Sequence, residues 1–121
     1  MVQDFLRALE LISDDAGRAE IRTEMSIIYQ KDQNLWRAEK ELALAVRLDD
    51  RNPSSWNQLG VCRAGLGYIE EGCKCYMKAI ALDNKNYEAW LNLALARKEV
   101  DLIIYLPCAD SLTAFKTTYV K

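Results

Sequence analysis

Two tryptophans recur in the same local frame of this chain, 34 residues apart. The segment that starts at Trp56 reads WNQLGVCR, and the segment that starts at Trp90 reads WLNLALAR. A repeat of this length that holds two amphipathic helices cannot bury its apolar faces alone, so neighbouring repeats must stack on one another. The recurrence therefore predicts a repeat protein with one continuous core and a groove along one side. Such an architecture favours binding over catalysis.

Apolar side chains recur at helical spacing between and before these segments. After a polar break at residues 32–34, one helix face is formed by Leu35, Ala38, Leu42, Ala45 and Val46. The next unit repeats this face with Ile69, Gly72, Cys73, Tyr76, Ala79 and Ile80. Polar turn residues follow each stretch, DDRN at 49–52 and DNKN at 83–86. The pattern predicts antiparallel helix pairs joined by short turns.

Composition and charge restrict the classes of partner. The chain is 50% hydrophobic and 28% charged, as in an ordinary soluble domain. Its formal net charge is −2, without the basic excess that attracts nucleic acid or anionic membranes. No apolar run approaches the ~18 residues of a membrane span, and the first residues are too polar for a signal peptide. We expect no nucleic-acid or membrane partner and a cytoplasmic location, with the nucleus as an alternative.

The cysteines do not form a metal-binding pattern. The chain has four, at positions 62, 73, 75 and 108, no histidine and no Cys-x-x-Cys pair. On a helix, Cys73 and Cys75 point about 200° apart and cannot share one ion. We expect reduced structural thiols, no metal and no cofactor.

These repeats resemble the tetratricopeptide repeat, a 34-residue helix-turn-helix unit. Residues 53–86 carry the fuller match, with Trp56, Leu59, Gly60, Tyr76 and Ala79. Residues 19–52 carry a weaker match, 87–100 correspond to the first helix of a further unit, and 2–14 look like the second helix of another. The resemblance implies an all-α, right-handed solenoid of antiparallel helix pairs over residues 1–100. It also implies that Trp56 and Trp90 pack between helices.

Residues 101–121 depart from the repeat. Five consecutive apolar residues, 102–106, precede Pro107, and they do not form an amphipathic partner helix. Leu112, Phe115 and Tyr119 recur at helical spacing, which allows a short helix at 111–120. This atypical tail indicates a fragment or variant of a longer solenoid.

The resemblance implies that a partner binds in the concave groove lined by the first helices. Projecting the repeat places these side chains there: Glu20, Thr23, Glu24, Ile27, Gln30, Ser54, Asn57, Gln58, Val61, Ala64, Glu88, Leu91, Asn92, Leu95 and Lys98. Gln58 and Asn92 are similar to groove amides that hold the backbone of an extended peptide in other members.

One subclass of the family clamps the C-terminal carboxylates of chaperones with a Lys-Asn-Asn-Lys-Arg set. The corresponding positions here are Thr23, Ile27, Gln58, Glu88 and Asn92. With no cation among them, we expect no chaperone carboxylate clamp. The expected partner is therefore another protein or extended peptide.

The sequence contains no candidate catalytic set. It has no histidine, no glycine-rich phosphate loop and no Gly-x-Ser-x-Gly elbow, so we expect a non-catalytic protein. The leading function is a peptide-binding module, and the alternative is a structural adaptor subunit that uses its convex face or helix edges. Residues 79–90 are also similar to the helical repeats of prenyltransferase subunits, but the strict 34-residue period favours the tetratricopeptide family.

Overall fold

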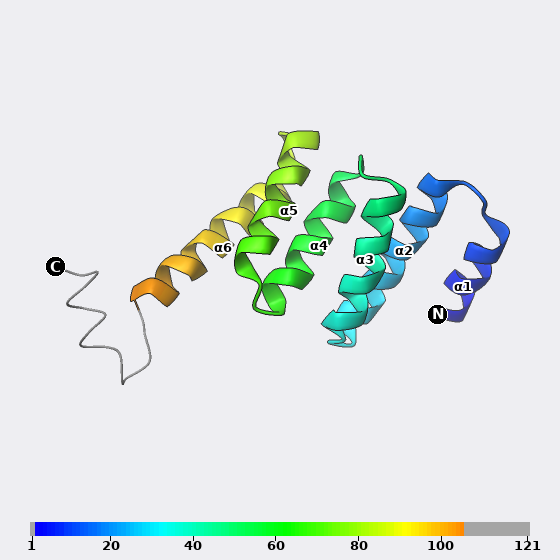
Figure 1. The fold of residues 1–121 in the computed structure, drawn as a ribbon, viewed down its shortest axis with the longest axis horizontal. Helices are drawn as coiled ribbons and strands as arrows, with labels where there is room; N and C mark the ends of the chain where they lie inside the picture. Colours follow the sequence, from blue (N-terminus) through cyan, green and yellow to red (C-terminus); the bar gives the residue numbers. More distant parts are fainter. Residues whose placement is uncertain (1, 106–121) are drawn as a thin grey trace.

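The computed structural model describes residues 2–105, and the side chains of residues 2–101. This part of the chain contains six helices and no strand: α1 (Val2–Leu11), α2 (Asp15–Lys31), α3 (Leu35–Leu48), α4 (Pro53–Gly65), α5 (Ile69–Leu82) and α6 (Tyr87–Tyr105). The helices follow one another along the long axis of the molecule, with α2 paired to α3 and α4 paired to α5 (Figure 1). The all-α solenoid expected from the sequence is confirmed.

Asparagine and aspartate side chains begin four of the helices, among them α6, where Asn86 accepts from the Ala89 amide at 3.2 Å. Asp14 accepts a hydrogen bond from the Gly17 amide at 2.9 Å, and Asn34 accepts one from the Arg37 amide at 3.3 Å. Asn52 accepts a hydrogen bond from the Ser54 amide at 2.9 Å, next to Pro53 in the first turn. Each cap satisfies an amide that has no partner inside the helix. The polar breaks seen in the sequence are therefore helix starts.

The turn inside each helix pair has the same geometry in both repeats. Residues 33 and 67 occupy equivalent positions, and both adopt positive φ, 60° for Gln33 and 98° for Gly67. The next amide in each turn, of Asn34 or Tyr68, donates at 2.8 Å to the carbonyl oxygen five residues earlier. Glycine adopts such a φ without steric cost, whereas glutamine is strained there. The repeat period thus extends to the backbone.

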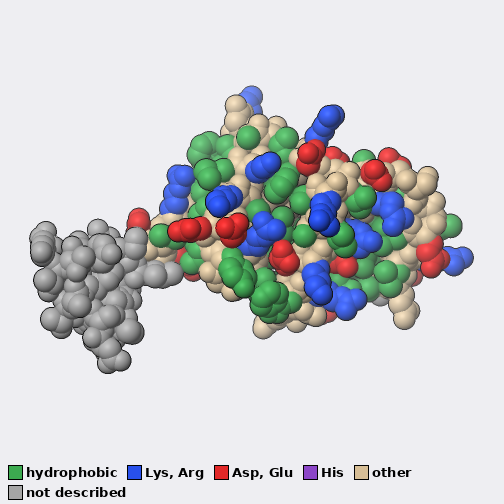
Figure 2. Space-filling model, viewed as in Figure 1, with side chains coloured by type: hydrophobic (Ala, Val, Ile, Leu, Met, Phe, Trp, Pro, Cys, Tyr) green, Lys and Arg blue, Asp and Glu red, His purple; other side chains and the backbone are tan. Residues whose placement is uncertain are grey.

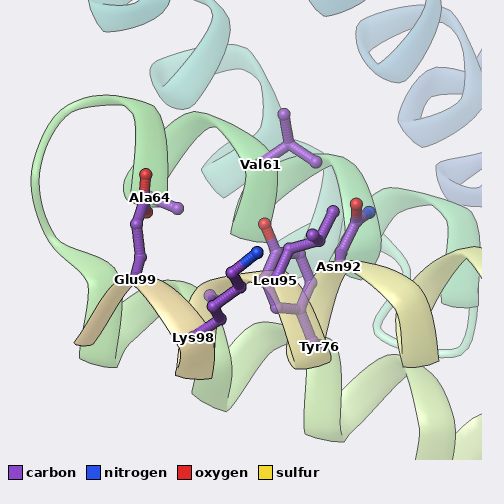
Figure 3. Close-up of a pocket in the computed structure, with 8 residues that line it drawn as sticks. Val61, Ala64, Tyr76, Asn92, Leu95, Lys98 and Glu99 are labelled. Atoms are coloured by element: carbon purple, nitrogen blue, oxygen red, sulfur yellow. The ribbon is translucent and has the colours of Figure 1, made fainter. Parts of the chain in front are cut away.

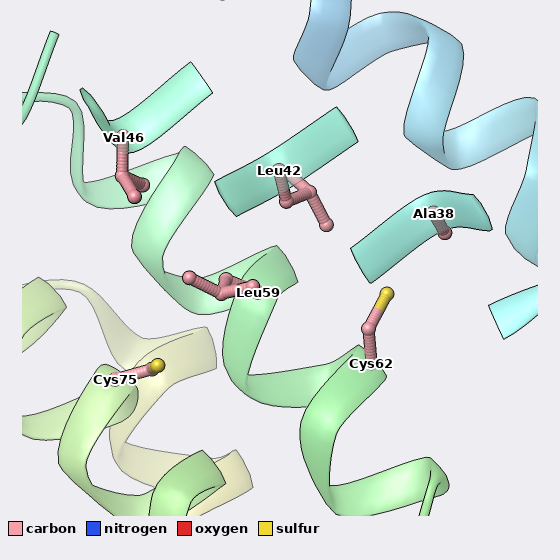
Figure 4. Packing of buried hydrophobic residues seen from close by; sticks show 6 residues of the cluster. All are labelled: Ala38, Leu42, Val46, Leu59, Cys62 and Cys75. Carbon is pink, nitrogen blue, oxygen red and sulfur yellow. The ribbon is translucent and has the colours of Figure 1, made fainter. Parts of the chain in front are cut away.

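One apolar core runs through neighbouring repeats. Its buried members come from three helices: Ala38, Leu42 and Val46 of α3, Leu59 and Cys62 of α4, and Cys75 of α5 (Figure 4). A second cluster at the N-terminal end joins Leu9 of α1 to Ile21 and Met25 of α2. Because α4 contributes to the core on both of its sides, the repeats stabilise one another rather than folding separately.

The two repeated tryptophans differ in their surroundings. Each donates its indole N–H to a carbonyl oxygen six residues earlier, Trp56 to Asp50 at 2.8 Å and Trp90 to Asn84 at 2.9 Å. Trp56 packs against the core, but Trp90 is 50% exposed. The expectation that Trp90 packs between helices is therefore wrong for the described part of the chain. A counterpart of α5 would begin 34 residues after Ile69, at position 103, where α6 instead continues to Tyr105.

Because α6 continues to Tyr105, the last helix ends later than the repeat predicts. We expected the first helix of the last unit to end at residue 100, and α6 extends past this point because no helix-breaking residue occurs before Pro107. The helix expected at 111–120 lies outside the described residues.

Candidate functional site

The first helices of the repeats form one face of the molecule. Helix α4 lies between α2 and α6, and side-chain hydrogen bonds link both pairs. Gln30 of α2 donates its amide to Gln58 of α4 at 3.0 Å, and Asn92 of α6 donates to Asn57 of α4 at 3.0 Å. The face built from these three helices is called the α2–α4–α6 groove below.

Two of the expected groove residues do not reach the surface, and the structure corrects them. Thr23 is 5% exposed and Asn57 is 3% exposed. The Thr23 hydroxyl donates to the Ala19 carbonyl oxygen and lies 2.8 Å from the Ser55 hydroxyl, while Asn57 accepts from Asn92. Both side chains serve helix packing, since each helix approaches its neighbour closely enough to cover them.

The other expected groove residues retain exposed surface. The exposed ones are Glu20, Glu24, Ser54, Glu88, Leu91, Leu95 and Lys98, and the half-buried ones are Ile27, Gln30, Gln58, Val61, Ala64 and Asn92. The groove thus presents carboxylates on α2 and at the start of α6, with amides and apolar side chains between them.

A cavity of about 390 Å³ opens in this groove between α4 and α6 (Figure 3). Its walls include Val61 and Ala64 of α4, Tyr76 of α5, and Asn92, Leu95 and Lys98 of α6. The cavity combines apolar walls with one amide, one cation and the carboxylate of Glu99. It is therefore suited to an apolar side chain that has a polar or anionic group beside it.

Sequence reasoning missed three lining residues, Ala96 and Glu99 of α6 and Tyr76, which belongs to a second helix. Its ring reaches the cavity because Gly60 has no side chain: a methyl group there would lie 2.5 Å from Tyr76 Cε1. Burial raises the pKa of Tyr76 to about 12, with smaller contributions from the nearby cysteines and Glu99. The phenol stays protonated at neutral pH. The repeat pattern pairs a small residue at Gly60 with an aromatic residue at Tyr76, and this pairing could have predicted that the Tyr76 ring lies against α4.

The thiols belong to the core. Cys62, Cys73 and Cys75 are free, and Cys108 lies outside the described residues. Burial raises the pKa of Cys62 to about 12, with a smaller contribution from the Glu39 carboxylate, and burial also raises the pKa of Cys75. Within residues 2–101, no three histidine, cysteine or acidic side chains lie together as a metal site would require. No described helix is both long enough and apolar enough to span a bilayer.

The geometry of the repeat agrees with a comparison to protein families. Residues 53–86 match the family model described as tetratricopeptide repeat. This segment of the chain is similar to a tetratricopeptide repeat. The match favours that family over the prenyltransferase alternative.

Among curated proteins, the chain is similar to tetratricopeptide repeat-containing protein trd-1 of Caenorhabditis elegans. The two are 28% identical over 92 residues, which are 76% of this chain and 12% of the other. The matched part of this chain thus spans about an eighth of the length of that relative.

Two solved structures share the fold. One is the first tetratricopeptide domain of Spaghetti (RPAP3) bound to the HSP90 peptide SRMEEVD. It aligns with a TM-score of 0.67 and 24% identity, over 69% of this chain and 66% of that chain. The other is the second tetratricopeptide domain of human RPAP3 in complex with the HSP70 peptide SGPTIEEVD. It aligns with a TM-score of 0.71 and 21% identity, over 79% of this chain and 78% of that chain.

These structures overturn one expectation from the sequence. We excluded chaperone-tail peptides because five positions of the groove contain no cation, yet both similar tetratricopeptide domains carry such a peptide. The exclusion is wrong. It gave no weight to Lys98, which lines the cavity together with Asn92 and Glu99, so the cavity offers a cation and an amide to a carboxylate.

Proposed function

We propose that this chain is a non-catalytic protein-interaction module that holds an extended peptide in the α2–α4–α6 groove. The observation that carries the proposal is the cavity between α4 and α6. There Asn92 and Lys98 lie beside the apolar walls of Val61 and Leu95. This arrangement can receive an apolar side chain and fix the peptide at one end by a carboxylate.

The amides of the groove suit the backbone of an extended peptide. Such a peptide presents free N–H and C=O groups, and a Gln or Asn side chain can both donate to and accept from them. Gln58 and Asn92 are half-buried, and their bonds to Gln30 and Asn57 use the Gln58 oxygen and the Asn92 nitrogen, so the Gln58 nitrogen and the Asn92 oxygen are the groups offered to a ligand. The protonated Tyr76 phenol adds a further possible donor in the same cavity.

A catalytic role has little support in the residues. The chain contains no histidine, and the raised pKa values of Cys62 and Cys75 keep both thiols protonated at neutral pH. Neither thiol is then an activated nucleophile.

The similar domains that carry chaperone peptides make acidic C-terminal tails the first ligands to test. We would titrate SRMEEVD and SGPTIEEVD calorimetrically, each with a free and with an amidated C-terminus. Lys98→Ala should weaken binding about tenfold, since a hydrogen bond to a charged group contributes ~1.5–3 kcal/mol. Lys31→Ala, at an exposed position in the last turn of α2, is the matched control and should leave the affinity unchanged.

A library of extended peptides extends the test beyond these two sequences. Selected peptides should perturb the side-chain amide signals of Gln58 and Asn92 in nuclear magnetic resonance spectra. If no peptide in the library binds saturably, or if every binder leaves these amides unperturbed, the proposal is overturned.

A further inference from the structure

A large hollow lies on the opposite face, beside α5. The turn after α3 lines it with Asp50 and Arg51, while α3 itself lines only an adjoining hollow. No Cα atom of α3 comes within 8 Å of a Cα atom of α5, although helices in direct contact have axes about 8–10 Å apart. Helix α4 forms the floor of this space with Trp56 and Arg63, and the hollow measures about 780 Å³. It is called the α3–α5 groove below.

Apolar side chains line both ends of this groove. Trp56, Met77 and Leu82 line one end. An adjoining hollow, which shares Arg63 and Glu71 with the first, contains Trp36 and Tyr68. These two rings pack edge to face with centroids 6.4 Å apart, while they remain 61% and 52% exposed. The groove therefore extends beside α5, whose 14 residues span about 21 Å at 1.5 Å per residue.

The lining of the α3–α5 groove holds more cations than carboxylates, although the chain is acidic. Arg51, Arg63, Lys74 and Lys78 stand against Asp50, Glu71 and the Glu39 of the adjoining hollow, while the chain as a whole has a net charge of −2. Figure 2 shows Lys and Arg side chains over the middle of this face with apolar side chains among them. The α2–α4–α6 groove instead presents the carboxylates of Glu20, Glu24 and Glu88, so the two faces differ in charge.

Two of these cations are available to a partner. Arg63 pairs with Glu39 at 3.4 Å and Lys74 with Glu71 at 3.5 Å. Within residues 2–101, neither Arg51 nor Lys78 has a carboxylate oxygen within 4.0 Å. The Lys78 ammonium lies 5.0 Å from the centre of the Trp56 ring. A carboxylate placed there would meet a cation above an apolar floor.

We propose that the α3–α5 groove is a second docking site, and that its occupant is an acidic amphipathic helix of a protein partner. A helix of about 14 residues matches the groove in length and offers one apolar stripe flanked by carboxylates. An extended strand fits less well, because the backbone groups inside α3, α4 and α5 are already paired within their helices. This site does not depend on peptide binding in the α2–α4–α6 groove. Two occupied faces would give the chain the adaptor role left open by its sequence.

The test uses the full chain and a synthetic helical peptide with leucines at i, i+3, i+4 and i+7 and glutamates on its flanks. A charge-swapped analogue carries lysine in place of each glutamate. The double variant R51E/K78E should weaken binding of the acidic peptide by tenfold or more, and added salt should weaken it too. Lys31→Glu makes the same charge change at one exposed position away from the groove and should alter the affinity less than twofold. Melting curves establish that each variant folds.

The three indole N–H signals report where the peptide binds. Single Trp→Phe variants assign them to Trp36, Trp56 and Trp90. The acidic peptide should shift the signals of Trp36 and Trp56, which line the groove, and leave that of Trp90 in place. The proposal is overturned by absence of binding, by equal binding of the charge-swapped peptide, by shifts confined to α2 and α6, or by a second copy of the chain that occupies the groove and excludes the peptide.

Discussion

The Gly60 carbonyl oxygen lies so close to Gly72 that a methyl group on Gly72 would sit 2.8 Å from it. In the other direction, a methyl group on Gly60 would lie 2.9 Å from the Gly72 carbonyl oxygen. The backbones of α4 and α5 therefore approach each other directly at this crossing. The approach brings Tyr76 against α4 and forms one wall of the cavity in the α2–α4–α6 groove.

Gly60→Ala should destabilise the chain although alanine is the better helix former. The new methyl group would overlap the Tyr76 ring and the Gly72 backbone, and overpacking of this kind costs ~1–3 kcal/mol. Gly65→Ala in the same helix is the control, because its methyl group meets only the end of the Leu35 side chain, which can move. Urea unfolding should separate the two variants, and equal stability would contradict the close crossing.

The two tryptophans should differ in their contributions to stability. Trp56→Ala should cost about 3 kcal/mol, the lower end of the range for emptying a buried aromatic site, because Trp56 is half-buried against the core. Trp90→Ala should cost no more than about half of this, since its ring is half exposed. Both make the same indole hydrogen bond, so that contribution cancels in the comparison. Equal costs would show that residues beyond α6 cover Trp90.

The Asn57–Asn92 hydrogen bond should appear as a coupling between α4 and α6. Asn92→Ala leaves the buried Asn57 oxygen without its donor, which costs ~1–3 kcal/mol. Gln58→Ala should cost less, because Gln30 and Gln58 are only half-buried and water can replace their bond. A double-mutant cycle on Asn57 and Asn92 measures the coupling, and strictly additive effects would refute it. Because Asn57 affects folding, it is unsuitable for testing ligand binding, and Lys98 serves better.

Stability should fall at alkaline pH. The pKa of Cys62 rises from 9.0 to about 12 on folding, and that of Tyr76 from 10.0 to about 12. The unfolded chain loses these protons first, so the full stability holds below pH 9 and declines as pH rises towards 12. Cys62 alone should contribute a slope of ~1 kcal/mol per pH unit above pH 9. Urea unfolding at pH 7, 9 and 10 should show a shallower decline for Cys62→Ala, and parallel curves would exclude this role for the thiol.

The repeat period, the starts of the helices and most of the core were determined by the sequence itself. Ala38, Leu42 and Ala45 recur at helical spacing, and residues such as Asn34 and Asn52 begin helices through bonds to their own neighbours. These features depend on local geometry, and the 34-residue period repeats them. They could therefore be predicted with no knowledge of the contacts between helices.

Only the tertiary structure decided which polar side chains remain free to bind. Thr23 and Asn57 occupy groove positions in the repeat, yet neighbouring helices cover them and accept or supply their hydrogen bonds. Lys98 enters the cavity, and Trp90 stays exposed because α6 continues where a turn was expected. The basic α3–α5 groove likewise arises from the spacing of two helices that do not touch. The exposure of a side chain and its neighbours depend on how separate helices pack. A local pattern of residues carries little information about the distance between such helices.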